Sequence, residues 1–321
     1  MLVTMVQAIC DALKVAMEKD STVLLLGEDI GKNGGVFRAT EGLYEQFGES
    51  RVIDTPLAEA GMVGTSIGLC LNGFRPVVEI QFMGFVYPAF EQIVCHVARF
   101  RTRTQGLYPC PLVIRLPYGG GINAPEIHSD STESLFVHIP GLKVVVPSNP
   151  FDAKGLLLSA IEEQDPVIFL EPIKLYRMFK QDIKEGYYSL PLEKAAIVKE
   201  GLDVTLISWG SMVSVAKEAQ ENTTYSCEII DLRSLYPLDE ETILNSVKKT
   251  KRVVIIHEAA KTAGLGAEIA ALISEKAIFY LEAPILRVTG YDVPVPMFAL
   301  EGFFRPNVGR VVASIKKVME Y

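Results

Sequence analysis

The sequence predicts an α/β protein made of two doubly wound domains, each built on a mainly parallel sheet. Short β-rich runs alternate with helical segments along the chain, which is typical of this class. Several of the runs are apolar without interruption, as in strands that helices cover on both faces. The alternation stops and restarts near residue 190, and 321 residues suffice for two domains. We therefore place one domain at residues 1–185 and the other at 186–321.

In the first domain, strands and helices follow one another from residue 3 onward. The predicted strands span residues 22–26, 51–54, 76–80, 112–116, 143–146 and 167–170. The predicted helices span residues 3–19, 58–71, 86–101 and 149–163. In the last of these, Pro150 occupies the first turn, where its missing N–H has no helical partner to lose.

A mixed, charged stretch from residue 171 to 201 connects the two domains, and a second series of alternating strands and helices begins after it. That stretch is not rich in glycine and serine, so we expect an ordered connection. The predicted strands that follow span residues 204–208, 227–232 and 253–257, and the predicted helices span 212–221, 239–249, 267–275 and 311–319. Asp239 is expected to cap its helix, with two glutamates in the first turn and lysines in the last, as the helix dipole favours.

Composition argues against several function classes. The 31 basic and 39 acidic residues give a net charge of −8, which disfavours a nucleic-acid or anionic-membrane surface. No apolar run reaches the roughly 18–20 residues of a membrane span, and the start lacks a signal-peptide pattern. The five cysteines show no C-x-x-C spacing and the four histidines are scattered, which argues against a disulfide framework and a zinc site. We expect a cytoplasmic protein.

Three segments interrupt the regular pattern, each directly after a predicted strand. In residues 54–62, Glu59 opens a helix that is unusually rich in small residues. Residues 117–131 form a long loop with three successive glycines and His128, a residue type suited to acid–base catalysis. Residues 82–90 are largely aromatic and could wall a cofactor ring. Because the carboxyl ends of parallel strands meet at one sheet edge, we expect the three segments to converge.

Each segment also has a structural interpretation without function. Glu59 could simply complement the helix dipole, His128 could be a solvated loop residue, and the aromatic run could be core packing.

The same residues resemble a known family along nearly the whole chain. The sequence is similar to the β subunit of the thiamine-diphosphate-dependent 2-oxo acid dehydrogenase component of the large acyl-transferring complexes. The similarity rests on collinear blocks: LLLGEDIG (24–31), DTPLAEAGMVGTSIG (54–68), RPVVEIQF (75–82), residues 128–157, EIIDLRSLYPLDEETI (228–243), HEAAKTAGLGAEIA (257–270) and RVTGYDVPVP (287–296). The resemblance implies a pyrimidine-binding fold followed by a transketolase C-terminal-type domain.

The resemblance also implies roles for single residues. Glu59 matches the glutamate that hydrogen-bonds the aminopyrimidine ring of thiamine diphosphate, and Phe85 matches the aromatic residue packed on that ring. Leu57 and Gln81 are expected to line the same site, and His128 matches a histidine that acts at the substrate and in acyl transfer to the lipoyl group. The backbone carbonyls near Leu112, Ala160, Ile161, Glu163 and Asp165 fall where many members hold a potassium ion.

One motif of thiamine-diphosphate enzymes is missing. The Gly-Asp-Gly sequence that holds Mg²⁺ and the diphosphate does not occur in this chain. The resemblance therefore implies that an α subunit holds Mg²⁺ and half of the cofactor, in an assembly of two α and two β subunits. The other implied partner is the lipoyl-bearing dihydrolipoamide acyltransferase core.

Two motif blocks bear on the substrate. Residues 128–141 and 151–162 look nearer to branched-chain members than to pyruvate members. We therefore expect oxidative decarboxylation of a branched-chain 2-oxo acid of the 2-oxoisovalerate type, with reductive acylation of lipoamide. Pyruvate and acetoin remain alternative substrates. A catalytically silent scaffold subunit and a self-sufficient transketolase-like enzyme remain alternative functions.

Overall fold

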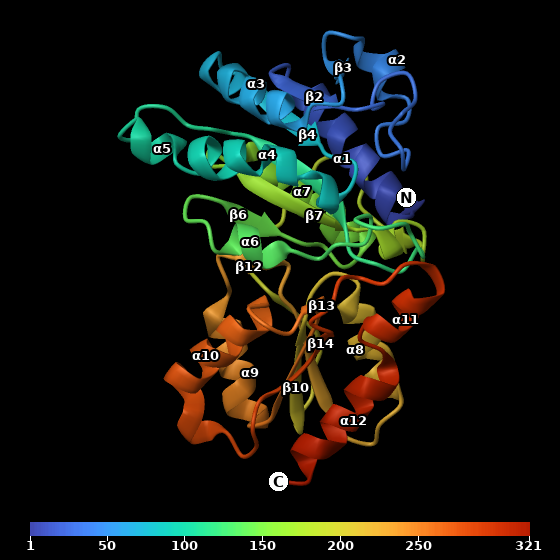
Figure 1. Cartoon of the computed structure of the whole chain (residues 1–321), viewed down its shortest axis with the longest axis vertical. Helices are drawn as coiled ribbons and strands as arrows, with labels where there is room; N and C mark the ends of the chain where they lie inside the picture. The colour runs from blue at the N-terminus through green and yellow to red at the C-terminus, as the bar shows by residue number, and fades with distance from the viewer.

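The computed structural model describes all 321 residues and contains two stacked α/β domains (Figure 1). The N-terminus lies in the upper domain of that view and the C-terminus at the far end of the lower one. Both predicted domains are therefore present, and each contains its own central sheet. No helix of the chain combines the length and apolarity needed to cross a membrane.

The upper domain is built on a seven-stranded sheet. Its strands, in spatial order, are β3 (Val52–Asp54), β2 (Val23–Gly27), β4 (Arg75–Glu79), β5 (Val113–Tyr118), β7 (Val167–Pro172), β6 (Lys143–Val145) and β12 (Ser234–Tyr236). All neighbouring pairs are parallel except β12 with β6. β12 comes from the second half of the sequence, so the two halves share a sheet.

Helices cover both faces of this sheet, which explains its uninterrupted apolar strands. On one face, α1 (Met5–Lys19) and α7 (Pro150–Glu162) pack over residues such as Val23 and Leu25. On the other face, α3 (Glu59–Leu71) and α4 (Tyr87–Glu91) pack over Leu24 and Leu26. Successive strand residues point to opposite faces, so a strand buried on both sides needs an apolar residue at every position.

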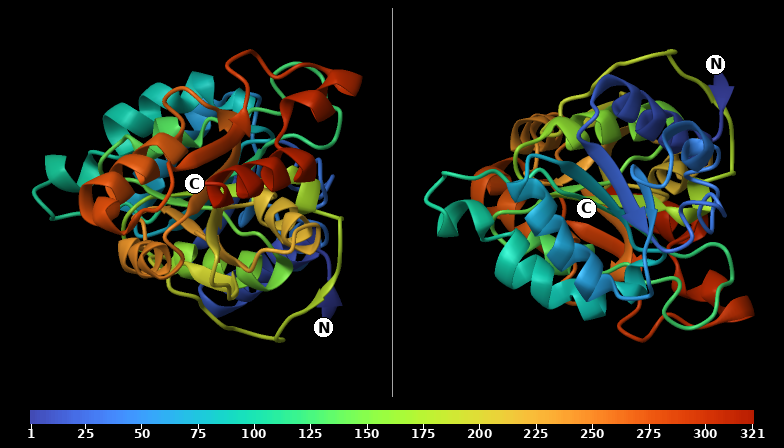
Figure 2. Two further views of the ribbon diagram at one scale, coloured as in Figure 1. Left: turned by 90° about the horizontal axis from the view of Figure 1, so that it is seen from below. Right: turned by 90° about the horizontal axis from the view of Figure 1, so that it is seen from above.

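The lower domain has a five-stranded sheet. Its order is β14 (Leu286–Gly290), β13 (Val253–Ala260), β10 (Val204–Ser208), β11 (Cys227–Asp231) and β9 (Ala196–Lys199), with only β9 antiparallel. α8 (Met212–Glu221) and α12 (Val308–Met319) cover one face, and α9 (Glu240–Thr250) and α10 (Leu265–Ala277) cover the other. The views from below and above show helices on both sides of the sheets (Figure 2).

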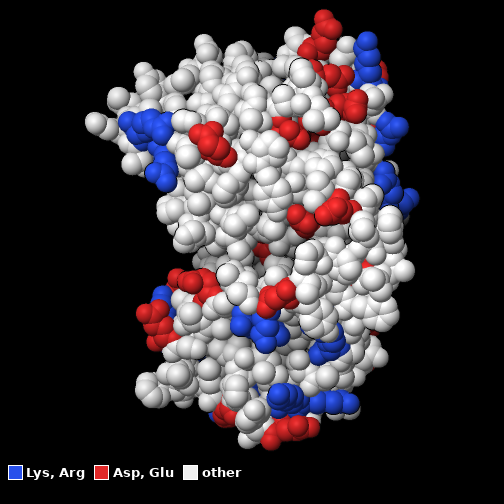
Figure 3. Space-filling view, viewed as in Figure 1, with Lys and Arg blue, Asp and Glu red and all other residues white.

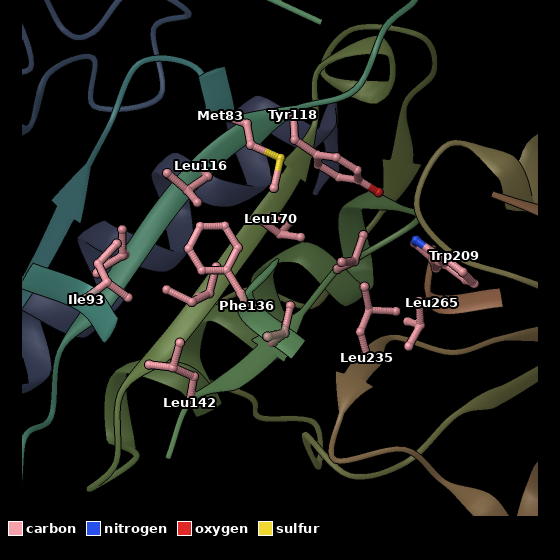
Figure 4. Close-up of a cluster of buried hydrophobic side chains, with 14 of the residues drawn as sticks. Met83, Ile93, Leu116, Tyr118, Phe136, Leu142, Leu170, Trp209, Leu235 and Leu265 are labelled. Carbon is pink, nitrogen blue, oxygen red and sulfur yellow. The ribbon is translucent and has the colours of Figure 1, made fainter. Parts of the chain in front are cut away.

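A single apolar cluster joins the two domains. One buried cluster contains Phe136 and Leu170 of the upper domain, Leu235 on the shared strand β12, and Trp209 and Leu265 of the lower domain (Figure 4). The connection between the domains is also held in place: Ser159 Oγ on α7 donates to the carbonyl of Leu190 at 2.6 Å. The boundary we expect at residues 185 and 186 falls in this connection, between β8 (Gln181–Asp182) and β9, and it remains a prediction.

The single continuous helix predicted at residues 86–101 is wrong, because the segment is interrupted. The chain instead forms α4, a π-helical turn at Gln92–Val97 and a short α5 (Phe100–Arg103). The carbonyls of Val94 and Cys95 accept hydrogen bonds from the guanidinium groups of Arg99 and Arg103. Because side chains satisfy these carbonyls, the regular helical ladder is not needed there.

A buried aspartate lies where the domains meet. Asp231, at the end of β11, accepts a hydrogen bond from Ser148 Oγ of the upper domain. It accepts a second one, at 3.1 Å, from the backbone N–H of Arg233, two residues further along the chain. Arg233 in turn forms a bidentate ion pair with Asp152 at 2.9 and 2.8 Å. Burial, which outweighs these hydrogen bonds, raises the pKa of Asp231 to about 7.

We expect Asp231→Asn to change how stability depends on pH. The native carboxyl holds its proton more tightly than the unfolded one, so its stabilising contribution is complete at acidic pH and is lost as pH rises toward 7. The free energy of unfolding of the wild type should therefore fall relative to Asp231→Asn over that range, by at most about 1.4 kcal/mol per pH unit. Urea denaturation of the purified chain at several pH values measures this. A Glu275→Gln control on exposed α10 should track the wild type, and a constant difference between wild type and Asp231→Asn would contradict the assignment.

Candidate active site

The three segments expected to converge lie at one edge of the upper sheet. Glu59 opens α3 after β3, the aromatic segment follows β4, and the loop with His128 follows β5. β3, β2, β4 and β5 are parallel, so these segments and the residues after β2 leave the sheet at its carboxyl edge. Open α/β sheets bind ligands at this edge.

Two glutamates are buried together at this edge. Glu59 and Glu28, which follows β2, each expose only 8 % of their surface. Burial and the repulsion from Glu59 and Asp29 raise the pKa of the Glu28 carboxyl above its ordinary value. The Oε1 atom of Glu28 is buried without a hydrogen-bond partner, so it is available to a bound group. The sequence interpretation missed Glu28, although an acidic residue directly after a buried strand beside β3 was a usable signal.

His128 lies against aromatic rings from the segment after β4. Its imidazole meets Phe82 at a ring-centroid distance of 4.5 Å and Phe85 at 5.0 Å, both edge to face. Its Nδ1 lies 2.8 Å from the carbonyl oxygen of Glu126, which orients the ring. The structure therefore brings together two of the predicted site residues, His128 and Phe85.

Gly84 makes this contact between the two segments possible. A Cβ atom at Gly84 would lie 2.0 Å from the carbonyl oxygen of Ile127, so no other residue fits without movement of the backbone. Ile127 itself has φ of 61°, which is unfavourable for a β-branched residue. The loop is therefore held in a strained conformation next to His128.

The other two predicted lining residues behave differently. Gln81 reaches into the site region, where its Nε2 donates to the carbonyl of Glu28 at 3.4 Å. Leu57 exposes 81 % of its surface, so it cannot line a closed site formed by this chain alone. An exposed leucine beside a buried glutamate fits a site that another subunit completes.

A buried ion network supports the strands that lead to this edge. Arg115 on β5 pairs with Glu79 on β4 at 2.7 Å and with Glu171 on β7 at 2.6 and 3.0 Å, and all three are almost fully buried. Tyr176 donates its hydroxyl hydrogen to Glu171 at 2.5 Å. Removal of one partner of such a network leaves an uncompensated charge, so the network holds three adjacent strands in register. Periodicity gave no indication of it.

Some of the carbonyl oxygens expected to bind potassium already accept hydrogen bonds from the protein. The Arg75 guanidinium donates to the carbonyls of Ile161 and Glu163, both at 2.9 Å, and the N–H of Val167 donates to the carbonyl of Leu112 at 2.9 Å. A guanidinium on two of the five expected oxygens disfavours a second cation there. In this arrangement the carbonyl set does not fit potassium well, and the ion stays a prediction. No group of three or more His, Cys, Asp or Glu is placed to hold another metal.

The site fits the aminopyrimidine half of thiamine diphosphate better than it fits a metal. Buried carboxyl groups can hydrogen-bond a nitrogen heterocycle, and Oε1 of Glu28 is a buried acceptor without a hydrogen-bond partner in the protein. The aromatic rings around His128 provide an apolar wall. The Gly-Asp-Gly motif expected to hold the diphosphate does not occur in this chain, so the diphosphate half of the site stays a prediction.

Charges are distributed without a dominant sign on the face in Figure 3. Basic and acidic groups appear there in small, separate clusters, and the surface is hollowed at the left where the two domains meet.

Comparison with known families and proteins agrees with this picture. Residues 2–178 match the transketolase pyrimidine binding domain and residues 193–311 match the transketolase C-terminal domain. The pyruvate dehydrogenase E1 component subunit beta of Staphylococcus epidermidis is 50 % identical over 321 residues, 99 % of each chain. The subunit of that name from Bacillus subtilis has the same identity and coverage. The one from Acholeplasma laidlawii is 48 % identical over 320 residues, 99 % of this chain and 98 % of the relative.

A solved structure shares the fold. The protein described as "Split gene transketolase, inactive beta4 tetramer" superimposes with a TM-score of 0.81 over 99 % of this chain and 98 % of that one. The two sequences are 23 % identical, so this likeness supports the two-domain transketolase-type fold and nothing further.

Proposed function

The chain belongs to the family of E1 β subunits of 2-oxo acid dehydrogenases, and we propose that it decarboxylates pyruvate oxidatively together with an α subunit. The observation that carries this proposal is the carboxyl edge of the upper sheet, where buried Glu59 and Glu28 lie in the same region as His128 and its aromatic neighbours. The acyl group would then pass to the lipoyl group of an acyltransferase core.

The substrate we propose differs from the one that the sequence motifs favoured. The motif blocks suggested branched-chain 2-oxo acids, but the relatives from Staphylococcus, Bacillus and Acholeplasma are all named as pyruvate dehydrogenase subunits. Their similarity extends over 98–99 % of their length, whereas the motif argument used two short blocks. Small pocket differences decide between substrates that differ by a few methyl groups, so the whole-length similarity deserves more weight.

Each site residue has a distinct task in the proposed reaction. Thiamine diphosphate, when bound, supplies the nucleophile that attacks the 2-oxo carbon. Glu59 would bind the aminopyrimidine ring and hold a proton there, in a position that its burial shields from water. Phe85 would pack on the ring, and Gln81 would orient nearby polar groups. His128, whose imidazole contacts the Phe85 ring, would act on the substrate and on the lipoyl group.

The α subunit would complete the site. We propose that it holds the diphosphate and Mg²⁺, since this chain contains no Gly-Asp-Gly motif, and that two α and two β subunits assemble. The exposed Leu57 would then be covered at the α–β contact. We propose a cytoplasmic location for the assembly.

Activity of the reconstituted enzyme tests this proposal. We expect the chain, copurified with the α subunit from the neighbouring gene, to reduce a dye acceptor with pyruvate. The kcat/KM for pyruvate should exceed that for 2-oxoisovalerate by about 10-fold or more. The chain alone should be inactive, because it lacks the diphosphate half of the site.

Other outcomes identify the alternatives. Turnover by the chain alone would contradict the need for an α subunit and support a self-sufficient enzyme. A higher kcat/KM for 2-oxoisovalerate would reverse the substrate assignment. An assembled complex that is inactive with both substrates, and with acetoin, would indicate a silent scaffold subunit.

A further inference from the structure

Carboxylates of the lower domain hold the glycine loop that leads to His128. The backbone N–H of Gly120 donates to Glu258 Oε2 at 2.9 Å, and Glu258 lies on β13 of the lower domain. The N–H groups of Gly121 and Asn123 donate to the two carboxylate oxygens of Glu301, the latter at 2.9 Å. Glu301 begins α11 (Glu301–Phe304) and is 2 % exposed. Three backbone donors of one loop thus end on two buried carboxylates.

Two of the three glycines leave room for this approach. A Cβ atom at Gly120 would lie 2.5 Å from Glu301 Oε1, and one at Gly121 would lie 2.7 Å from the side chain of Lys174. Gly121 also has φ of 109°, which other residues adopt poorly. The absence of side chains at Gly120 and Gly121 therefore lets the loop pack closely against Glu301 of the lower domain and Lys174 of the upper one.

Arg305 keeps Glu258, the first of these carboxylates, charged and in place. Its guanidinium forms a bidentate pair with Glu258 at 3.0 and 2.8 Å and also donates to Ser211 Oγ at 3.2 Å. Burial alone would raise the pKa of Glu258, but Arg305, Ser211 and the Gly120 N–H lower it below its ordinary value. Glu258 is therefore a carboxylate at neutral pH and a strong acceptor for the loop.

The held end of the loop is close in sequence to His128. Only the four residues 124–127 separate Asn123 from His128, and Ile127 is wedged against Gly84. A short segment, held at Asn123 by Glu301 and at Ile127 by the contact with Gly84, therefore leads directly to the imidazole.

We propose that Glu301 is a positioning residue for His128, with Glu258 and Arg305 as its support. The inference deepens the proposed function and rests on it, because it assumes that His128 acts in the reaction. It makes the lower domain a part of the active-site framework, beyond any role in assembly.

Kinetics of Glu301 variants in the assembled α–β enzyme test the proposal. We expect Glu301→Ala to lower kcat for acyl transfer to a lipoyl domain by about 10- to 100-fold, the scale of a misplaced catalytic group. Affinity for thiamine diphosphate should stay unchanged, because Glu59 lies on another segment. Glu301→Gln, which keeps the volume and one acceptor oxygen, should lose less, and Glu275→Ala on the surface should lose nothing.

A double-mutant cycle separates positioning from general destabilisation. In a His128→Ala background, Glu301→Ala should cause little further loss, since the group it positions is absent. An equal loss in both backgrounds, or no loss in Glu301→Ala alone, would overturn the proposal. If the double variant is too slow to measure, the pH profile of kcat in Glu301→Ala is used instead. A profile of unchanged shape, with kcat reduced only in proportion to the amount of folded enzyme, would also overturn the proposal.

The cycle also distinguishes this proposal from the function on which it rests. Full activity of His128→Ala would show that the role proposed for His128 is wrong. A strong effect of His128→Ala with none of Glu301→Ala would leave the proposed function standing and remove only the positioning role.

Discussion

Replacing Glu59 with glutamine is expected to lower kcat of the assembled enzyme by about 10²- to 10⁴-fold, the usual contribution of a general acid or base. Glutamine preserves the size of the buried side chain, which is 8 % exposed, but it cannot give up or take a proton. The loss should therefore appear in turnover, while the fold and the α–β assembly persist. Pyruvate-dependent dye reduction measures turnover, and size-exclusion chromatography measures assembly.

A matched control separates this role from helix stabilisation. Glu45 also lies in the first turn of a helix, α2 (Leu43–Phe47) in the same domain, but it is exposed. If Glu59 merely complemented the helix dipole, Glu59→Gln and Glu45→Gln would have similar effects, each worth about 0.3–1 kcal/mol of stability. Near-normal turnover by Glu59→Gln would then refute the catalytic assignment.

Much of the fold was predictable because the sheets are covered on both faces. Apolar runs marked β2, β5 and β6, and amphipathic periodicity marked the longer helices, with α8 correct at both ends. The transketolase-type fold and the family were also confirmed. Local sequence contains this information, since burial on both faces of a strand, or on one face of a helix, is visible in the residues of the element itself.

Elements that depend on distant partners were not predictable in this way. β12 has three residues and exists because it pairs with β6, about 90 positions earlier in the chain. β1 (Leu2–Val3) pairs with β8, about 180 positions later in the chain. Such short edge strands have no periodicity of their own, so only the folded chain shows them.

The site followed the same division. Glu59 and His128 were found because each interrupts a regular pattern after a strand. Glu28 was overlooked beside an otherwise ordinary strand, and the carboxylates of the lower domain lie about 140 to 180 positions from the loop that they hold. The preference for branched-chain 2-oxo acids rested on two short blocks. It was a weak basis for a substrate prediction, because pocket shape also depends on segments outside those blocks.

Gly84→Ala is the second substitution from which we expect a large effect. The added methyl group would meet the Ile127 carbonyl oxygen at 2.0 Å. That oxygen is a backbone atom and Cβ is bonded to the backbone, so a side-chain rotation cannot relieve the overlap. Relief requires the loop to move away from Phe82 and Phe85. Overpacking of this kind costs about 1–3 kcal/mol of stability. Displacement of His128 should lower kcat by up to about 10²-fold, even in enzyme that remains folded.

Two measurements and one control test this expectation. Urea denaturation of the chain should show the loss of stability, and acyl transfer by the assembled enzyme should show the loss of turnover. Gly309→Ala in α12 is the matched control, because its Cβ would meet only Asn307 Oδ1, at an ordinary 3.5 Å. A folded Gly84→Ala enzyme with normal turnover would mean that the loop can shift without consequence. His128 would then not need the contact with the aromatic segment, and the geometry of the proposed site would have to be revised.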